Sequence, residues 1–62
     1  MTDFDYIPVS KSTHIFDVVY KGHVIGIVWV RDGVWRSSIS SMSTPLSEAT
    51  SRDEAARLLL IA

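Results

Sequence analysis

The Asp32-Gly33 pair is the feature that most limits how this chain can fold. It lies between two runs rich in apolar residues, 23–31 and 34–39. A two-residue turn of type I′ needs positive φ at both central positions, which Asp and Gly tolerate, so the pair predicts a β-hairpin. The turn also fixes the register of the two strands. The expected cross-strand pairs are Arg31/Val34, Val30/Trp35, Trp29/Arg36, Val28/Ser37, Ile27/Ser38 and Gly26/Ile39.

A second turn, at Lys21-Gly22, predicts a further hairpin. The run 14–20 before it is rich in β-branched and aromatic residues, as strands are. The expected sheet is therefore a three-stranded antiparallel meander over residues 14–41, with 23–30 as its middle strand. The pairs expected from the second turn are Tyr20/His23, Val19/Val24, Val18/Ile25, Asp17/Gly26, Phe16/Ile27 and His14/Trp29.

Residues 51–62 are expected to form the one helix. Ser51 and Glu54 have the spacing of a capping box, in which the serine oxygen accepts from the Glu54 amide and the carboxylate reaches back. The stretch 42–50 is rich in Ser and Thr and is predicted to be a loop. Residues 1–13, which a proline interrupts, are predicted to be an irregular arm or a short edge strand. The chain is thus expected to be a single α+β domain of βββα order.

Alternation along the strands sorts the expected sheet into two faces. One face has Gly26 in mid-strand, where a missing side chain often marks the close approach of another segment, so we expect the helix there. A small sheet covered by one helix is a stable two-layer arrangement. The helix residues expected closest to the glycine are Ala55 or Ala56, Leu59 and Ala62. The face comprises Ile15, Asp17, Val19, Val24, Gly26, Val28, Val30, Trp35 and Ile39.

The other face of the expected sheet is unusually apolar. Antiparallel sheets commonly leave one face polar and in contact with water. Either the amino-terminal arm covers this face with Phe4, Tyr6 and Ile7, or the face is an interface, because large contiguous apolar patches are uncommon on soluble monomers. Tyr, Trp and Arg are also enriched at interface centres. The residues expected to bind a partner are Phe16, Val18, Tyr20, Ile25, Ile27, Trp29 and Arg36.

Length and composition narrow the classes of protein to consider. The chain has 62 residues, no cysteine and a net charge of −1. A core of this size typically supports about 3–5 kcal/mol, and without disulfides association is the reinforcement that remains. The slightly negative charge does not favour nucleic acid. No run approaches the roughly 18 apolar residues of a membrane span, and the acidic start is unlike a signal peptide, so a cytoplasmic protein is expected.

The sequence predicts no catalytic residue, metal or cofactor. His14 and His23 are expected at opposite ends of neighbouring strands, about 20 Å apart, which is too far for a shared ion. The serine clusters have no base at the spacing that makes a nucleophile, and no glycine-rich phosphate loop is present. Asp17 is the one charge expected on an apolar face. A buried unpaired carboxylate is costly, so it must reach solvent, a backbone amide, Arg52 or Arg57.

Two segments resemble small proteins of actinobacteria and their phages. They are 20–36, which holds the tryptophan-bearing hairpin, and the helix sequence 51–59, of the form (S/T)-R-x-E-A-A-x-x-L. This resemblance implies the βββα fold and no activity. The outline is also similar to the arm-site-binding domain of tyrosine integrases and to the plant ethylene-response DNA-binding domain. The sheets of those domains lie in the major groove and carry several outward Arg and Trp residues, which Lys21, Arg31 and Arg36 match only in part.

We therefore predict a small non-enzymatic interaction protein of phage accessory type, which forms a homodimer or binds another protein through the apolar sheet face. The alternative is a DNA-binding domain that uses Arg31, Arg36, Lys21 and Trp29 on the sheet face. Affinity for the phosphate backbone needs several cationic contacts, and this chain offers few of them.

Overall fold

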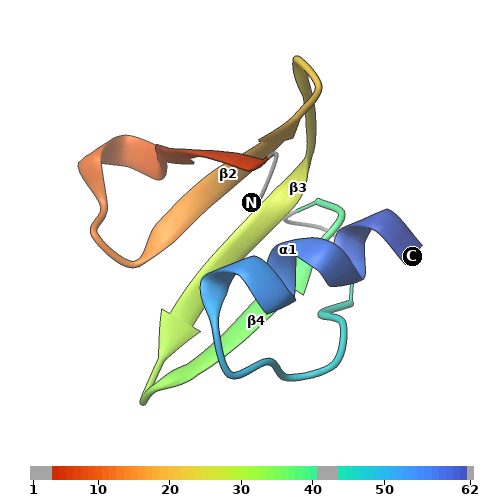
Figure 1. Cartoon of the computed structure of the whole chain (residues 1–62). Coiled ribbons are helices and arrows are strands. Elements are labelled where there is room, and N and C mark those ends of the chain that lie inside the picture. The colour runs from red at the N-terminus through yellow and green to blue at the C-terminus, as the bar shows by residue number, and fades with distance from the viewer. Residues whose placement is uncertain (1–3, 41–43, 62) are drawn as a thin grey trace.

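The computed structural model of the protein describes residues 4–40 and 44–61. Within these ranges the chain forms an antiparallel sheet of four strands and one carboxy-terminal α-helix, so the α+β class is confirmed and the expected number of three strands is wrong. The strands follow one another across the sheet in sequence order (Figure 1). The elements are β1 (Phe4–Pro8), the 3₁₀ turn η1 (Val9–Lys11), β2 (Ile15–Tyr20), β3 (His23–Arg31), β4 (Val34–Ser38) and α1 (Arg52–Ile61).

Both predicted hairpin turns are confirmed by the backbone. The two central residues of each turn have positive φ, 54° and 77° at Asp32-Gly33 and 51° and 83° at Lys21-Gly22. This is the type I′ geometry, whose twist matches that of paired strands.

The β3–β4 hairpin has the predicted register. Its pairs run from Arg31/Val34 to Ile27/Ser38, as the turn requires. Strand β4 ends at this last pair, so the expected pairing of Ile39 is not formed.

Strand β3 contains a β-bulge that the sequence pattern did not predict. Val18 pairs with Gly26 and Val19 pairs with Val24, which leaves Ile25 as an extra residue between them. The two pairs nearest the turn are as predicted, and every pair beyond the bulge is shifted by one residue. Because side chains alternate with a period of two, this shift exchanges the faces of β2 relative to the rest of β3.

The predicted face of each β2 residue is therefore wrong. Phe16 and Val18 were expected on the face away from the helix, but both pack into the core under α1. Asp17 was expected under the helix, but it lies on the opposite face, across from Ile7 and Ile27. The other residues that change faces are Ile15, Val19, Tyr20, His23, Val24 and Ile25.

The amino-terminal arm forms the edge strand β1, one of the two predicted alternatives. It pairs with β2, with Phe4 opposite Tyr20 and Tyr6 opposite Val18. Phe4 and Tyr6 thus lie on the helix side and pack against the core, while Ile7 points to the other side. The arm widens the sheet, so of the two alternatives for the far face, the one in which the arm lies across it is wrong.

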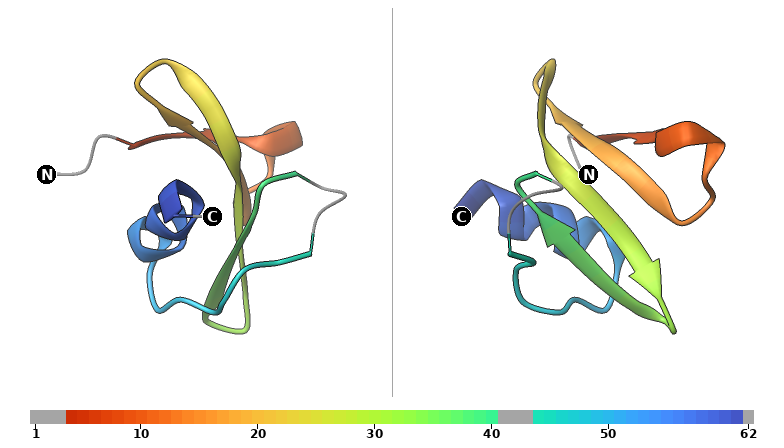
Figure 2. Two further views of the ribbon diagram at one scale, coloured as in Figure 1. Left: turned by 90° about the vertical axis from the view of Figure 1, so that its right-hand side faces the viewer. Right: turned by 180° about the vertical axis from the view of Figure 1, so that it is seen from behind.

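Helix α1 begins with the predicted serine cap. The Ser51 hydroxyl oxygen accepts a hydrogen bond from the Glu54 amide at 3.1 Å, and the Glu54 carboxylate accepts one from the Thr50 hydroxyl at 3.2 Å. Asp53 and Glu54 also place negative charge in the first turn, where the helix dipole favours it. The helix lies across β3 and β4 on one side of the sheet (Figure 2).

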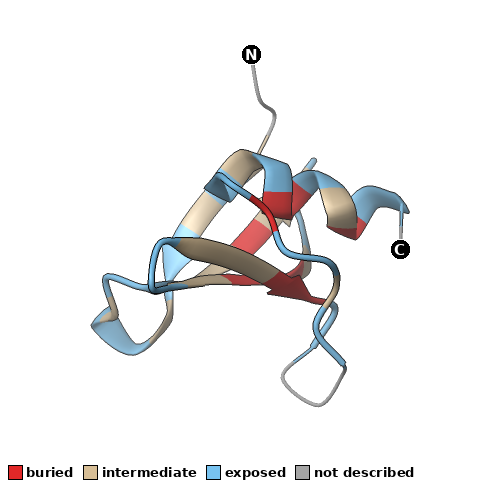
Figure 3. Cartoon of the chain, turned by 90° about the horizontal axis from the view of Figure 1, so that it is seen from below, coloured by how far each residue is buried: buried red, intermediate tan, exposed pale blue. Residues whose placement is uncertain are grey.

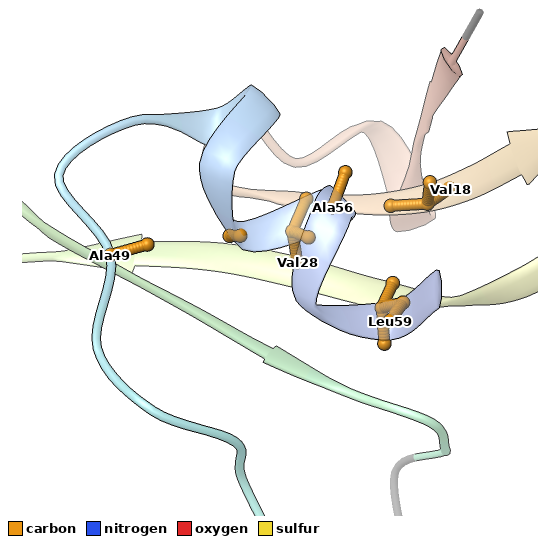
Figure 4. Close-up of a cluster of buried hydrophobic side chains, with 6 residues drawn as sticks. Val18, Val28, Ala49, Ala56 and Leu59 are labelled. Carbon is orange, nitrogen blue, oxygen red and sulfur yellow. The ribbon is translucent and has the colours of Figure 1, made fainter. Parts of the chain in front are cut away.

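The core between α1 and the sheet is small and consists largely of small side chains. The buried positions cluster where the helix meets the strands (Figure 3), and the helix contributes two alanines to them. Figure 4 shows these side chains between α1 and the strands. The buried core comprises Val18, Val28, Ala49, Ala55, Ala56 and Leu59.

The helix and the sheet come closest at Gly26, as predicted. A Cβ atom built at this position would lie 2.6 Å from the Ser38 carbonyl oxygen and 2.8 Å from Leu59 Cδ2. The expected contact with Leu59 is confirmed, whereas Ala62, also expected there, lies outside the described residues. Glycine is therefore required here by space.

Gly26→Ala is expected to lower the free energy of unfolding by about 2 kcal/mol, because the added methyl group overlaps a backbone oxygen in a packed site. Urea unfolding followed by tryptophan fluorescence measures this change. Val24→Ala, at an exposed position of the same strand, is the control and should change the stability by less than about 1 kcal/mol. Equal stability of Gly26→Ala and the wild type would contradict the close approach.

Ser37→Ala is expected to raise the free energy of unfolding by about 1 kcal/mol. Ser37 is fully buried, and its hydroxyl is the one buried side-chain polar atom in the described ranges that has no hydrogen-bond partner. Removing a hydroxyl that has lost its water without gaining a partner relieves its desolvation cost. Thermal unfolding tests this, with Ser47→Ala at an exposed site as the control. A fall in stability for Ser37→Ala would show that the hydroxyl is hydrogen-bonded in solution.

Candidate interaction surface

The face of the sheet opposite α1, called the open face below, is lined mainly by apolar side chains. Cross-strand partners and alternate residues along a strand share a face, which assigns its members from the register. Three of its aliphatic side chains, Ile7, Ile15 and Val24, are 51%, 40% and 63% exposed. The residues of the open face are Asp5, Ile7, Ile15, Asp17, Val19, Val24, Ile27, Trp29, Arg31, Val34, Arg36 and the buried Ser38.

The structure divides the seven residues predicted to bind a partner between the two faces of the sheet. Ile27, Trp29 and Arg36 lie on the open face, as predicted. Those on the helix side are Phe16, Val18, Tyr20 and Ile25. The seven residues therefore do not form one patch, because the bulge in β3 turns β2 over.

Four aliphatic residues of the open face are missing from the predicted binding surface. Two features of the sequence point to the bulge that changes the faces of β2. A glycine in the interior of a strand often marks a bulge, and Gly26 lies next to the one found here. Asp17 was the only charge expected under the helix, and a one-residue slip places it on the solvent side. The four residues are Ile7, Ile15, Val19 and Val24.

A shallow hollow of about 520 Å³ lies at the β3–β4 end of the open face. Trp29 and Arg36, which are cross-strand partners as predicted, line it together. The Arg36 guanidinium is 2.9 Å from the Glu48 carboxylate, and both side chains are exposed, so the ion pair stabilises the fold little. The remaining lining residues are Arg31, Asp32, Val34 and Pro45.

The four residues of the DNA-binding alternative are not brought together. Trp29, Arg31 and Arg36 line the hollow, whereas Lys21 lies in the turn at the other end of β3. Strand β3 has nine residues, so its ends are about 26 Å apart. The hollow also contains as many acidic as basic side chains, which weakens its attraction for phosphate.

The two histidines occupy the separate positions that the sequence predicted. Both are exposed, with His14 preceding β2 and His23 opposite Tyr20 at the far end of that strand. Within residues 4–40 and 44–61, no three potential metal-ligating side chains of His, Cys, Asp or Glu form a group.

A second polar cluster joins β1 to the start of α1. The Tyr6 hydroxyl donates a hydrogen bond to Asp53 Oδ1, and the Arg52 guanidinium carbon lies 4.0 Å from the Tyr6 ring centroid and 5.4 Å from that of Phe16. Burial, and then the hydrogen bond to Asp53, raise the pKa of Tyr6 above its ordinary value. These groups bind one another across two elements, so we assign the cluster a structural role in holding the edge strand against the helix.

No family model matches the chain, and neither a curated protein nor a solved structure matches it. The resemblance to actinobacterial proteins and to the integrase domain therefore stays a prediction. No helix in the described part of the chain has the length and apolar character that crossing a bilayer requires.

Tyr6→Phe is expected to lower the free energy of unfolding by about 1–2 kcal/mol at neutral pH, because it removes the hydrogen bond to Asp53. The wild type should lose part of this advantage above about pH 10, because the unfolded chain then releases the Tyr6 proton while the folded chain retains it. Urea unfolding at neutral pH and at about pH 11 should show the difference between the two proteins shrinking. Parallel pH profiles would contradict the raised pKa, and Tyr20→Phe serves as the control.

Proposed function

We propose that the chain is a small non-enzymatic interaction protein whose open face binds another protein surface. The observation that carries this proposal is the run of apolar side chains on the side of the sheet that the chain's own helix does not cover. The free face of an antiparallel sheet is normally polar. On soluble proteins, large contiguous patches of exposed apolar residues commonly mark interaction sites.

The arrangement of residue types on the open face also supports the proposal. Trp29 lies in the row of cross-strand partners between Ile15 and Arg36. The rows on either side of it contain the aliphatic residues Ile27 and Val34, and each of these rows also contains one charged residue. Trp and Arg are the residues that contribute most often to binding at interface centres, and a surrounding aliphatic area excludes water from them. Trp29 is accordingly the expected centre of the binding surface.

The size of the core gives a second reason to expect association. Among the described residues, three of the six buried core residues are alanines, and the larger apolar side chains packed against them are only partly buried. A partner that binds only the folded chain stabilises it by mass action. A cytoplasmic location and a phage accessory role, both inferred from the sequence, belong to the same proposal.

Ile15→Lys is expected to abolish association while leaving the fold intact, because a charge then lies directly beside Trp29, at the end of the cross-strand row that contains it. Ile61→Lys is the matched control, since this isoleucine is exposed on α1, away from the open face. Sedimentation and affinity capture compare the two variants with the wild type, and far-UV circular dichroism checks their folding.

The proposal requires that the wild type and Ile61→Lys associate, with themselves or with another protein, and that Ile15→Lys does not. It is overturned if the wild type is monomeric and retains no protein, or if Ile15→Lys associates as strongly as the control.

A further inference from the structure

Asp17 is the feature of the open face that the proposed function leaves unexplained. It is half-buried between the aliphatic side chains of Ile7 and Ile27 on the neighbouring strands. None of the residues that the structure describes forms an ion pair with it. A carboxylate on an apolar surface that another protein covers must meet a cation there, because burying it unpaired is costly.

Arg31 is the cation of the open face that is available to meet it. It is exposed at the hairpin end of β3, and it too forms no ion pair with any described residue, whereas Arg36 is held by Glu48 at 2.9 Å. Arg31 and Asp17 lie too far apart along the strands to pair within one chain, at about 13 Å by strand rise.

The two charges are evenly placed about Trp29. Asp17 lies beside Ile27, two residues before Trp29 in β3, and Arg31 lies two residues after it. Both are therefore about 6.6 Å from the level of Trp29, in opposite directions along the strand. A two-fold axis that crosses the strands at Trp29 exchanges these two levels.

The geometry points to a second copy of this chain as the occupant of the open face, an inference that rests on the proposed function. Two open faces stacked about this axis bring Trp29 against its symmetry mate and set Arg31 of each copy over the level of Asp17 in the other. The sideways step from β3 to β2 is about 4.8 Å, which an arginine side chain spans. The interface then contains two equivalent Arg31–Asp17 ion pairs, one on each side of the row that contains Trp29, and the Arg36 of that row is already paired with Glu48 of its own chain.

The area that such a dimer needs is a modest share of the chain's accessible surface. A stable interface buries about 800 Å² on each partner. This is about a fifth of the chain's accessible surface of 4348 Å², and the open face is one of the two broad faces of a two-layer molecule.

A charge-swap experiment tests the pairing. Asp17→Lys sets two lysines against two arginines, and Arg31→Asp sets two aspartates against two others, so each single variant should raise the dimer dissociation constant at least about tenfold. The double variant Asp17→Lys/Arg31→Asp restores opposite charges and should return the dissociation constant to within about threefold of the wild type. Sedimentation equilibrium over a concentration series measures all four proteins.

Asp5→Lys is the matched control for Asp17→Lys. It makes the same charge change on the same face, but Asp5 lies opposite Val19, beyond Asp17, at a level that the axis does not bring over Arg31. It should leave the dissociation constant within about threefold of the wild type.

A monomeric wild type, or a double variant no tighter than the single ones, overturns the proposed dimer. If the wild type dimerises and Ile15→Lys dissociates it while the charge swap fails, the arrangement about Trp29 is wrong and the interaction surface stands. If Ile15→Lys has no effect, the proposed function falls as well.

Discussion

The contact between Gly26 and Leu59 is the constraint on which the rest of the structure depends. Strand β3 admits the helix only where a side chain is missing, and the bulge beside that position turns Ile25 toward the core and Val24 away from it. The bulge in turn decides which side of β2 lies under α1. One extra residue thus determines the composition of both faces of the sheet, including the open face.

The parts of the fold that follow from local chemistry were predictable from the sequence. Asp32-Gly33 and Lys21-Gly22 each form the expected turn, because positive φ at two successive positions excludes most other residues. Ser51 caps the helix where the pattern predicted it, since the hydroxyl satisfies an amide that no helix carbonyl reaches. In each case the residues that determine the local structure lie in the same short segment as that structure.

The parts that were not predictable depend on contacts between distant segments. β1 was open to two interpretations because nothing in its own residues decides whether it pairs with β2 or stays irregular, and the Tyr6–Asp53 hydrogen bond that holds it joins opposite ends of the chain. The bulge is not predicted from the sequence, because a regular alternation of side chains through Gly26 fits the apolar residues of β3 equally well. Four of the seven residues predicted to bind a partner are therefore on the wrong face in the prediction, whereas the predicted face of Ile27, Trp29 and Arg36 is correct.

The predicted faces of β2 contain two unfavourable placements that indicate a shifted register. Strict alternation places an acid under the helix at Asp17 and puts Phe16 and Val18 on the face that the helix does not cover, two unfavourable placements that a one-residue shift of β2 removes together. A one-residue error in register produces both placements together, a charged residue on the buried face and apolar residues on the exposed face, because it moves every side chain of the strand to the other face. With the observed register, Ile15 and other aliphatic residues of the open face are still exposed, and no other segment of the described chain covers them. They are the part of the surface for which a partner is the physical explanation.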